Sequence, residues 1–137
     1  MAEIVVNSDH MEISVEGLTA TKRYLHNLDN AVRVRLKKSF VNVGLLVQRE
    51  ARRRAPYKEG NLERSIDYEA QEDQVRVFVP LNSPAGRYAY QKHEGTYNPG
   101  AGTRAKGPHA GRKYIKRAID ENADKISLQF RTVIDKL

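Results

Sequence analysis

The sequence predicts an α+β fold in which a small antiparallel sheet of three or four strands packs against a long N-terminal helix and a C-terminal helix. Apolar residues recur at steps of three and four in two long stretches, which is the period of an amphipathic helix. Between these stretches they alternate in short runs, which is the period of a half-buried strand. With 137 residues, of which 39% are hydrophobic, the chain is expected to form one domain over residues 1–137.

Composition excludes several classes of protein. The chain has no cysteine, so it can form neither disulfides nor thiolate metal sites. It has no apolar run of membrane-spanning length, and we expect no membrane association. The N-terminal sequence is acidic and lacks the basic start and apolar core of a signal peptide, so a cytoplasmic location is expected.

The N-terminal part predicts a strand followed by a long helix. Met11, Ile13 and Val15 alternate with polar residues, and Gly17 ends this strand. A helical pattern then covers Thr19–Ala55, with a break expected at Asn27–Asn30. The apolar stripe of this pattern consists of Leu25, Leu28, Val32, Leu36, Phe40, Val43, Val47 and Ala51.

A fixed corner is predicted where the long helix meets the sheet. Pro56 cannot continue a helix, because it lacks an amide donor and restricts Ala55 before it. Gly60 permits a tight turn, and Leu62 with Ile66 begins a new apolar face. We therefore interpret Pro56, Gly60, Leu62 and Ile66 as the residues that anchor the fold.

Two strands and a hairpin are expected after the corner. Leu62, Ile66, Tyr68 and Ala70 mark the first strand, and Val75, Val77, Val79 and Leu81 mark the second. The acidic turn Glu72–Asp73 lies between them. A third, short strand is expected from Tyr88 to near Glu94.

The rest of the chain predicts a loop and a helix. Gly95–Gly111 contains five glycines and two prolines, has no periodicity, and is expected to be a mobile loop of about residues 95–111. Apolar residues then recur at helical spacing from Arg112 to the C-terminus, which predicts a second amphipathic helix.

Charge is segregated along the chain, whose formal net charge is +7. Thr19–Ala55 holds ten Lys and Arg against two acids, Glu59–Asp73 holds six acids against one Arg, and Arg87–Arg117 holds eight Lys and Arg against one acid. This pattern suits either a nucleic-acid surface or contacts between oppositely charged patches of neighbouring subunits. The residues expected at a subunit or partner interface are Arg49, Arg52, Arg53, Glu72 and Asp73.

No motif points to catalysis, a cofactor or a metal ion, and we expect the protein not to be an enzyme. The chain lacks a phosphate-binding Gly-rich loop, a nucleophile elbow and histidines at metal-ligand spacing. His93 and Glu94 are adjacent, and on a strand they would point to opposite faces and form no acid–base dyad. The better candidates for partner contact, or for contact with DNA in a channel, lie in the Gly-rich loop: Tyr97, Arg104, Lys106 and His109.

The order of these motifs resembles a family of small tailed-bacteriophage neck proteins, the head–tail joining or tail-completion components. Its pattern Ala-Pro-x-x-Thr-Gly-x-Leu-x-x-Ser-Ile is matched at Ala55-Pro56 and Gly60–Ile66, with Glu59 where Thr is usual. A second segment is matched by Tyr90 and Glu94-Gly95-Thr96. The resemblance spans about residues 12–135.

The resemblance implies a structural virion protein that is assembled in the host cytoplasm and located in the neck. Its implied partners are copies of itself in a closed ring, a hexamer or dodecamer, and the adjacent head-completion and tail-terminator or tail-tube proteins. Its basic loop would either clasp an adjacent ring or contact passing DNA without sequence preference. The alternatives that remain open are a small basic nucleic-acid-binding protein and, third, a ribonuclease toxin that uses His93 or Arg104.

Overall fold

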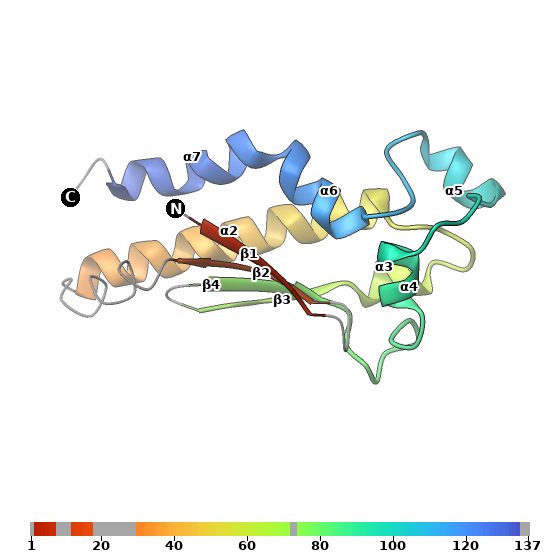
Figure 1. Cartoon of the computed structure of the whole chain (residues 1–137). Coiled ribbons are helices and arrows are strands. Elements are labelled where there is room, and N and C mark those ends of the chain that lie inside the picture. Colours follow the sequence, from red (N-terminus) through yellow and green to blue (C-terminus); the bar gives the residue numbers. More distant parts are fainter. Residues whose placement is uncertain (1, 8–11, 18–29, 72–73, 135–137) are drawn as a thin grey trace.

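The computed structural model describes residues 2–7, 12–17, 30–71 and 74–134, and its elements combine helices with antiparallel strands (Figure 1). The strands are β1 (Ala2–Asn7), β2 (Glu12–Gly17), β3 (Asp67–Ala70) and β4 (Gln74–Phe78). The helices are α2 (Asn30–Arg54), α3 (Asn61–Ser65), α4 (Ala89–Glu94), α5 (Ala101–Lys106), α6 (Tyr114–Glu121) and α7 (Ala123–Ile134). The predicted class, mixed helix and antiparallel strand, is confirmed.

The strands lie in the order β1-β2-β4-β3, and each neighbouring pair is antiparallel. In the predicted hairpin, Tyr68 of β3 lies opposite Val77 of β4, and Ala70 lies opposite Val75. The pairing of β3 with β4 is therefore confirmed. The acidic turn residues Glu72 and Asp73 lie outside the described residues.

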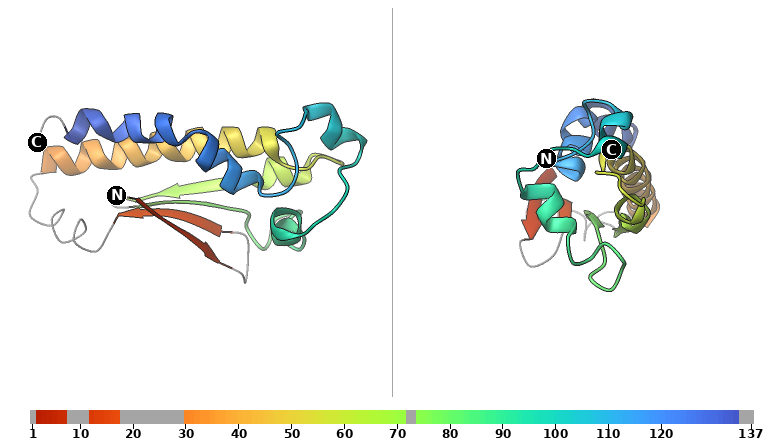
Figure 2. Two further views of the ribbon diagram at one scale, coloured as in Figure 1. Left: turned by 45° about the horizontal axis from the view of Figure 1, so that its top comes forward. Right: turned by 90° about the vertical axis from the view of Figure 1, so that its right-hand side faces the viewer.

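The long helix α2 connects the two layers of the molecule. It packs against β3 and β4 on one side and against α6 and α7 on the other (Figures 1 and 2). Val43, Val47 and Ala51 of the predicted apolar stripe are fully buried, because they face the sheet and α6 together. The predicted helix is confirmed over Asn30–Arg54, whereas its expected part before Asn30, with the break, lies outside the described residues.

Three predicted strands are wrong in part or in whole. The strand expected to include Val79 and Leu81 ends at Phe78, and Leu81 is 63% exposed. Leu62 belongs to helix α3, and β3 begins only at Asp67. Leu62 and Ile66 are both buried and lie four residues apart, which is the spacing of one helical turn. The expected strand at Tyr88–Glu94 is helix α4, because Ala85, Ala89 and His93 turn inward at steps of four.

The Gly-rich segment and the C-terminal helix also differ from expectation. Ala101–Lys106 forms helix α5, so the segment is not free of secondary structure. The C-terminal pattern gives two helices, which are separated at Asn122. The Asn122 side-chain amide donates to the Ala118 carbonyl at 2.8 Å and turns the chain there. Among the described residues, no helix is long and apolar enough to cross a membrane.

Candidate interaction site at the Pro56 corner

The corner between α2 and β3 is built from the residues that the sequence marks as anchors. Pro56 follows the end of α2, and Gly60 adopts φ 79° at the start of α3. This left-handed conformation is one that glycine adopts without the steric cost that a Cβ adds. Leu62 and Ile66 then insert into the core with 3% and 0% exposure. Pro56 is thus followed by a left-handed turn at Gly60 and by two core residues, Leu62 and Ile66.

The segment that follows α4 returns to this corner and is fastened there by hydrogen bonds. The Thr103 hydroxyl accepts from the Tyr57 amide at 2.8 Å. The Gly111 amide donates to the Arg54 carbonyl, the last of α2, at 2.7 Å. Residues far apart in sequence thus share one small region of the surface.

Lys106 makes the densest set of contacts in this region. Its ammonium donates to the carbonyls of Arg52 and Ala55, both at 2.9 Å, and to a Glu63 carboxylate oxygen at 2.5 Å. The last carbonyls of a helix have no partner within the helix. Lys106 satisfies two carbonyls at this helix end, and its positive charge suits the negative end of the helix dipole.

A cleft of about 790 Å³ lies between the corner and this segment. Tyrosine rings and the backbone of α5 form much of its wall, and two lysines line it. Its lining residues include Tyr57, Tyr88, Tyr97, Lys58, Lys92 and Ala101. The Lys92 ammonium lies 4.5 Å from the centre of the Tyr97 ring, a cation–π distance.

The Tyr97 hydroxyl points back to the protein and donates to the Lys92 carbonyl at 2.7 Å. Burial raises the pKa of Tyr97 to about 12, so the phenol stays neutral at physiological pH. Arg104 is exposed and donates to the Pro99 carbonyl at 2.6 Å, and His109 is half-buried. The predicted loop residues therefore have different environments: Lys106 and Tyr97 are engaged in the fold, whereas Arg104 faces solvent.

The predicted basic interface lies on α2. Arg49, Arg52 and Arg53 are exposed, and Arg53 pairs with Glu50 at 2.7 Å. Arg49 and Arg52 make no ion pair among the described residues. Together with Arg35 and Lys38 they follow one exposed side of the helix at helical spacing, and we call this set the outer stripe of α2. The remaining predicted interface residues, Glu72 and Asp73, are not described by the structure.

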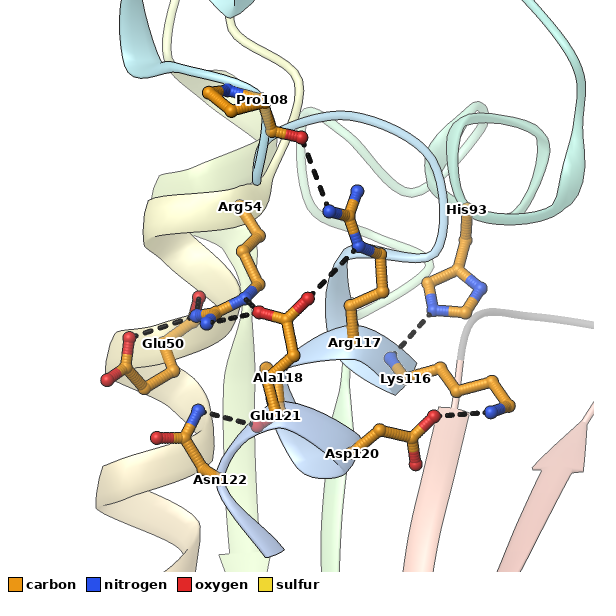
Figure 3. Close-up of polar contacts among 10 residues, drawn as sticks. All are labelled: Glu50, Arg54, His93, Pro108, Lys116, Arg117, Ala118, Asp120, Glu121 and Asn122. Atoms are coloured by element: carbon orange, nitrogen blue, oxygen red, sulfur yellow. Dashed lines mark hydrogen bonds and ion pairs between the residues drawn. The ribbon is translucent and has the colours of Figure 1, made fainter.

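Arg54, in contrast, is buried and belongs to a charge network that joins α2 to α6 (Figure 3). Its guanidinium contacts Glu50 at 2.9 Å and Glu121 at 2.7 Å. Hydrogen bonds from Arg54 lower the pKa of both carboxyl groups, against the opposing effect of desolvation. The run Arg52-Arg53-Arg54 in the sequence did not indicate which of the three arginines is buried.

His93 and Glu94 are closer than the predicted strand would allow. Both lie on α4, and His93 Nδ1 is 3.4 Å from a Glu94 carboxylate oxygen, which also pairs with the Lys113 ammonium. His93 Nε2 accepts from the Lys116 amide at 3.2 Å (Figure 3). Because Nε2 is an acceptor, the neutral ring carries its proton on Nδ1, which faces Glu94.

His93 and Glu94 contribute to the stability of the fold. The His93 side chain is 0% exposed, and burial lowers its pKa to about 4, despite the raising effect of Glu94. The neutral imidazole satisfies one of the first amides of α6, which have no partner within that helix. The expectation that the two residues lie on a strand and point to opposite faces is wrong, because both belong to helix α4, which brings them within contact distance.

The part of the chain that the structure describes contains no group of three or more His, Cys, Asp or Glu that could hold a metal ion. The site consists of a cleft lined by Tyr57, Tyr88 and Tyr97, and the exposed cations of the outer stripe lie on α2. The residues that sequence reasoning missed here are Tyr57 and Lys58. The sequence shows only that these residues are aromatic or basic, because segments far apart in the chain form the cleft together. Comparison of the chain with protein-family models, with curated proteins and with solved structures gave no significant match.

Proposed function

We propose that this chain is a structural subunit of a tailed-bacteriophage head–tail junction, where copies of it form a closed ring that links the head-completion complex to the tail. In this proposal its four strands and its helices act as one rigid unit of the ring wall, without cofactor and without catalysis. The subunit would be incorporated into the virion neck after assembly in the host cytoplasm.

The observation that supports the proposal most is the position in the fold of the residues that match the family pattern. Ala55, Leu62 and Ile66 are buried at the corner, and Gly60 has the backbone conformation that its place in the pattern demands. A pattern whose members hold a fold together fits a protein that works by its shape. A catalytic family would instead share exposed polar residues in a cleft.

The outer stripe of α2 supports assembly through charged surfaces. Its cations Arg35, Lys38, Arg49 and Arg52 have no ion pair among the described residues. The buried cation Arg54 is paired internally. A cation that no described carboxylate neutralises within the subunit is available to a neighbour, where complementary patches fix orientation and speed encounter.

The test is the oligomeric state of the purified protein. Light scattering coupled to size exclusion, with negative-stain images, should show a closed ring of six or twelve copies, and Arg49→Glu with Arg52→Glu should weaken it. A chain that stays monomeric at high concentration and low salt, and that no neck or tail protein recruits into a ring, would contradict the proposal.

The outer stripe also favours a second candidate, a small nucleic-acid-binding protein. The two differ in their binding behaviour. A neck subunit should bind DNA weakly, with a steep dependence on salt and no sequence preference. Salt-resistant, sequence-selective binding at physiological ionic strength would favour the second candidate. RNA cleavage that is lost on replacing His93 or Arg104 would favour a ribonuclease.

A further inference from the structure

One edge of the sheet is only partly protected. Among the described residues β3 pairs with β4 alone, and the Gln71 amide donates to the Gln74 carbonyl at 2.8 Å. Hydrogen-bonded and non-hydrogen-bonded pairs alternate along an antiparallel ladder. Counting back from Gln71, the register places Tyr68 and Ala70 in non-hydrogen-bonded pairs, so their amides and carbonyls point away from β4.

The first half of this edge is covered by side chains of the same subunit. The Ile66 carbonyl accepts from the Gln48 amide group at 3.0 Å and from the Arg52 guanidinium at 3.2 Å. The Tyr68 amide donates to the Asp67 carboxylate at 2.8 Å. The second half, from the Tyr68 carbonyl to the carbonyl of Ala70, has no hydrogen-bond partner among the described residues. An edge left open in this way is a template for another strand.

The opposite edge of the sheet is the strand β1, with the sequence AEIVVN. Among the described residues β1 pairs only with β2. The sequence of β1 has neither proline nor lysine, the residues that often block an edge. Among the described residues, each copy therefore carries two different edge strands, β1 and β3, that pair on one side only.

The two edges are compatible in direction. The sheet has four strands that alternate in direction, so β1 and β3 run antiparallel to each other. A second copy in the same orientation, placed beside the first, would bring its β1 next to β3 as an antiparallel neighbour. Such a contact joins two different surfaces, and it closes into a ring when the rotation between copies divides a full turn.

We infer that β1 of one copy adds to the β3 edge of the next copy, so that a continuous sheet joins the subunits. This inference rests on the proposed ring and names its contact. The partner is a second copy of this chain, and the bonds are main-chain hydrogen bonds, which give strand addition its affinity.

Cysteine cross-linking tests the contact directly, because the chain has no cysteine of its own. Glu69 lies opposite Arg76, Arg76 lies opposite Ser14, and Ser14 lies opposite Val5, so these four residues share one face of the sheet. Glu69→Cys is therefore combined with Glu3→Cys or Val5→Cys, whose positions in β1 lie on that face. Oxidation should give a ladder of covalent multimers up to the closed ring. Ile4→Cys, one residue out of this row, should cross-link poorly, since neighbouring positions of a strand alternate between its faces. Glu69→Cys with Gln91→Cys, on exposed α4, is the matched control.

Two edge variants with opposite expected effects complete the test. Ala70→Pro removes only an amide that points outward and should weaken association by about tenfold or more, while circular dichroism confirms an intact fold. Asp67→Ala frees the Tyr68 amide and should strengthen association.

The outcomes separate the inference from the proposed function. The inference would be overturned, and the proposed ring left intact, by rings that form without cross-links at Glu3 or Val5. The same holds if neither Ala70→Pro nor Asp67→Ala changes ring formation. Absence of any self-association would instead count against the proposed function. Cross-links that form only when another protein supplies the strand would also overturn the inference, because the occupant would not be a second copy.

Discussion

Gly44 lies where the long helix crosses the sheet, directly over the ring of Tyr68. A Cβ built on Gly44 would come within 2.3 Å of a Tyr68 ring carbon. The glycine therefore sets how closely α2 and β3 approach, and its cost to helix propensity, about 1 kcal/mol relative to alanine, is offset by this packing.

Gly44→Ala should therefore destabilise the protein, although alanine is the better helix former. Overpacking of this kind costs about 1–3 kcal/mol, which urea unfolding would measure as a lower midpoint. Gly100→Ala is the control, because a Cβ there meets nothing within 4 Å. Equal midpoints for the two variants would show that the Tyr68 ring moves aside at no cost.

His93 gives the stability of the protein a dependence on pH. Its pKa is about 4 in the folded chain and near 6.5 when unfolded. Between these values the unfolded state binds more protons, so the free energy of unfolding rises with pH. The stabilisation is fully present above pH 6.5 and is lost as the pH falls toward 4, a total of about 3 kcal/mol.

His93→Phe keeps a ring against Tyr114 but removes the titrating group. Urea unfolding between pH 4.5 and 6.5 should therefore lose most of its pH slope in this variant, while His109→Gln should keep it. The pKa values of Glu50, Glu94 and Glu121 are lowered, so the stability that these carboxylates contribute is lost at lower pH than the contribution of His93. An unchanged slope in His93→Phe would mean that another group carries the effect.

At the scale of elements, one buried arginine supplies the charged part of the contact between α2 and α6. The side chain of Arg54 is 8% exposed and that of Glu50 is 5% exposed, whereas Arg53, which contacts the same carboxylate, is 58% exposed. Removing one partner of a buried pair leaves the other charge poorly compensated, whereas an exposed pair contributes little.

Arg54→Met should thus lower the free energy of unfolding by about 3 kcal/mol, and Arg53→Met by less than about 1 kcal/mol. Chemical denaturation at pH 7 would measure both. Similar losses in the two variants would contradict the assignment of the α2–α6 contact to Arg54.

The corner is a second element-scale feature with a direct test. Gly60 has φ 79°, and a Cβ there would also crowd the Arg64 guanidinium at 2.6 Å. Gly60→Val should therefore cost more stability than Pro56→Ala, which removes only a conformational restraint. Thermal unfolding of the two variants gives the comparison. If neither substitution changes the midpoint of thermal unfolding, the corner does not anchor the fold.

For the whole molecule, periodicity in the sequence predicts the parts whose environment is local. The stripe from Val32 to Ala51 specifies α2, and the alternation that includes Val75 and Val77 specifies β4. Whether a short segment forms a helix or a strand depends instead on its packing against the rest of the fold. The tyrosines around Ala89 resemble a strand, yet a step of four from Ala85 through Ala89 to His93 buries the helical face.

The candidate site shows the same division. Type and charge indicate that Arg49, Arg52 and Arg104 are exposed, and they are. Nothing local distinguishes Lys106 from Arg104, or Arg54 from Arg53. Their roles depend on which carbonyl or carboxylate the fold brings near, and that information lies in residues tens of positions away.

The outer stripe of α2 gives a prediction for the intact protein. Arg49→Gln with Arg52→Gln should weaken DNA binding about equally for all sequences. It should also reduce the slope of log K against log salt by about two, if both residues neutralise phosphates. Fluorescence anisotropy over a salt series measures the slope, and Arg112→Gln, on another part of the surface, is the control. A slope that stays the same would assign the DNA contact elsewhere.

The cap that Lys106 places on α2 has a consequence for how the chain folds. The two carbonyls it satisfies lie 51 and 54 residues earlier in the sequence. The end of the long helix therefore cannot be completed by local interactions, and these two carbonyls must wait until the chain has been synthesised past Lys106 and α5 has docked. Closing so long a loop is entropically slow. Lys106→Met should consequently speed unfolding and leave the refolding rate almost unchanged, giving a φ-value near zero.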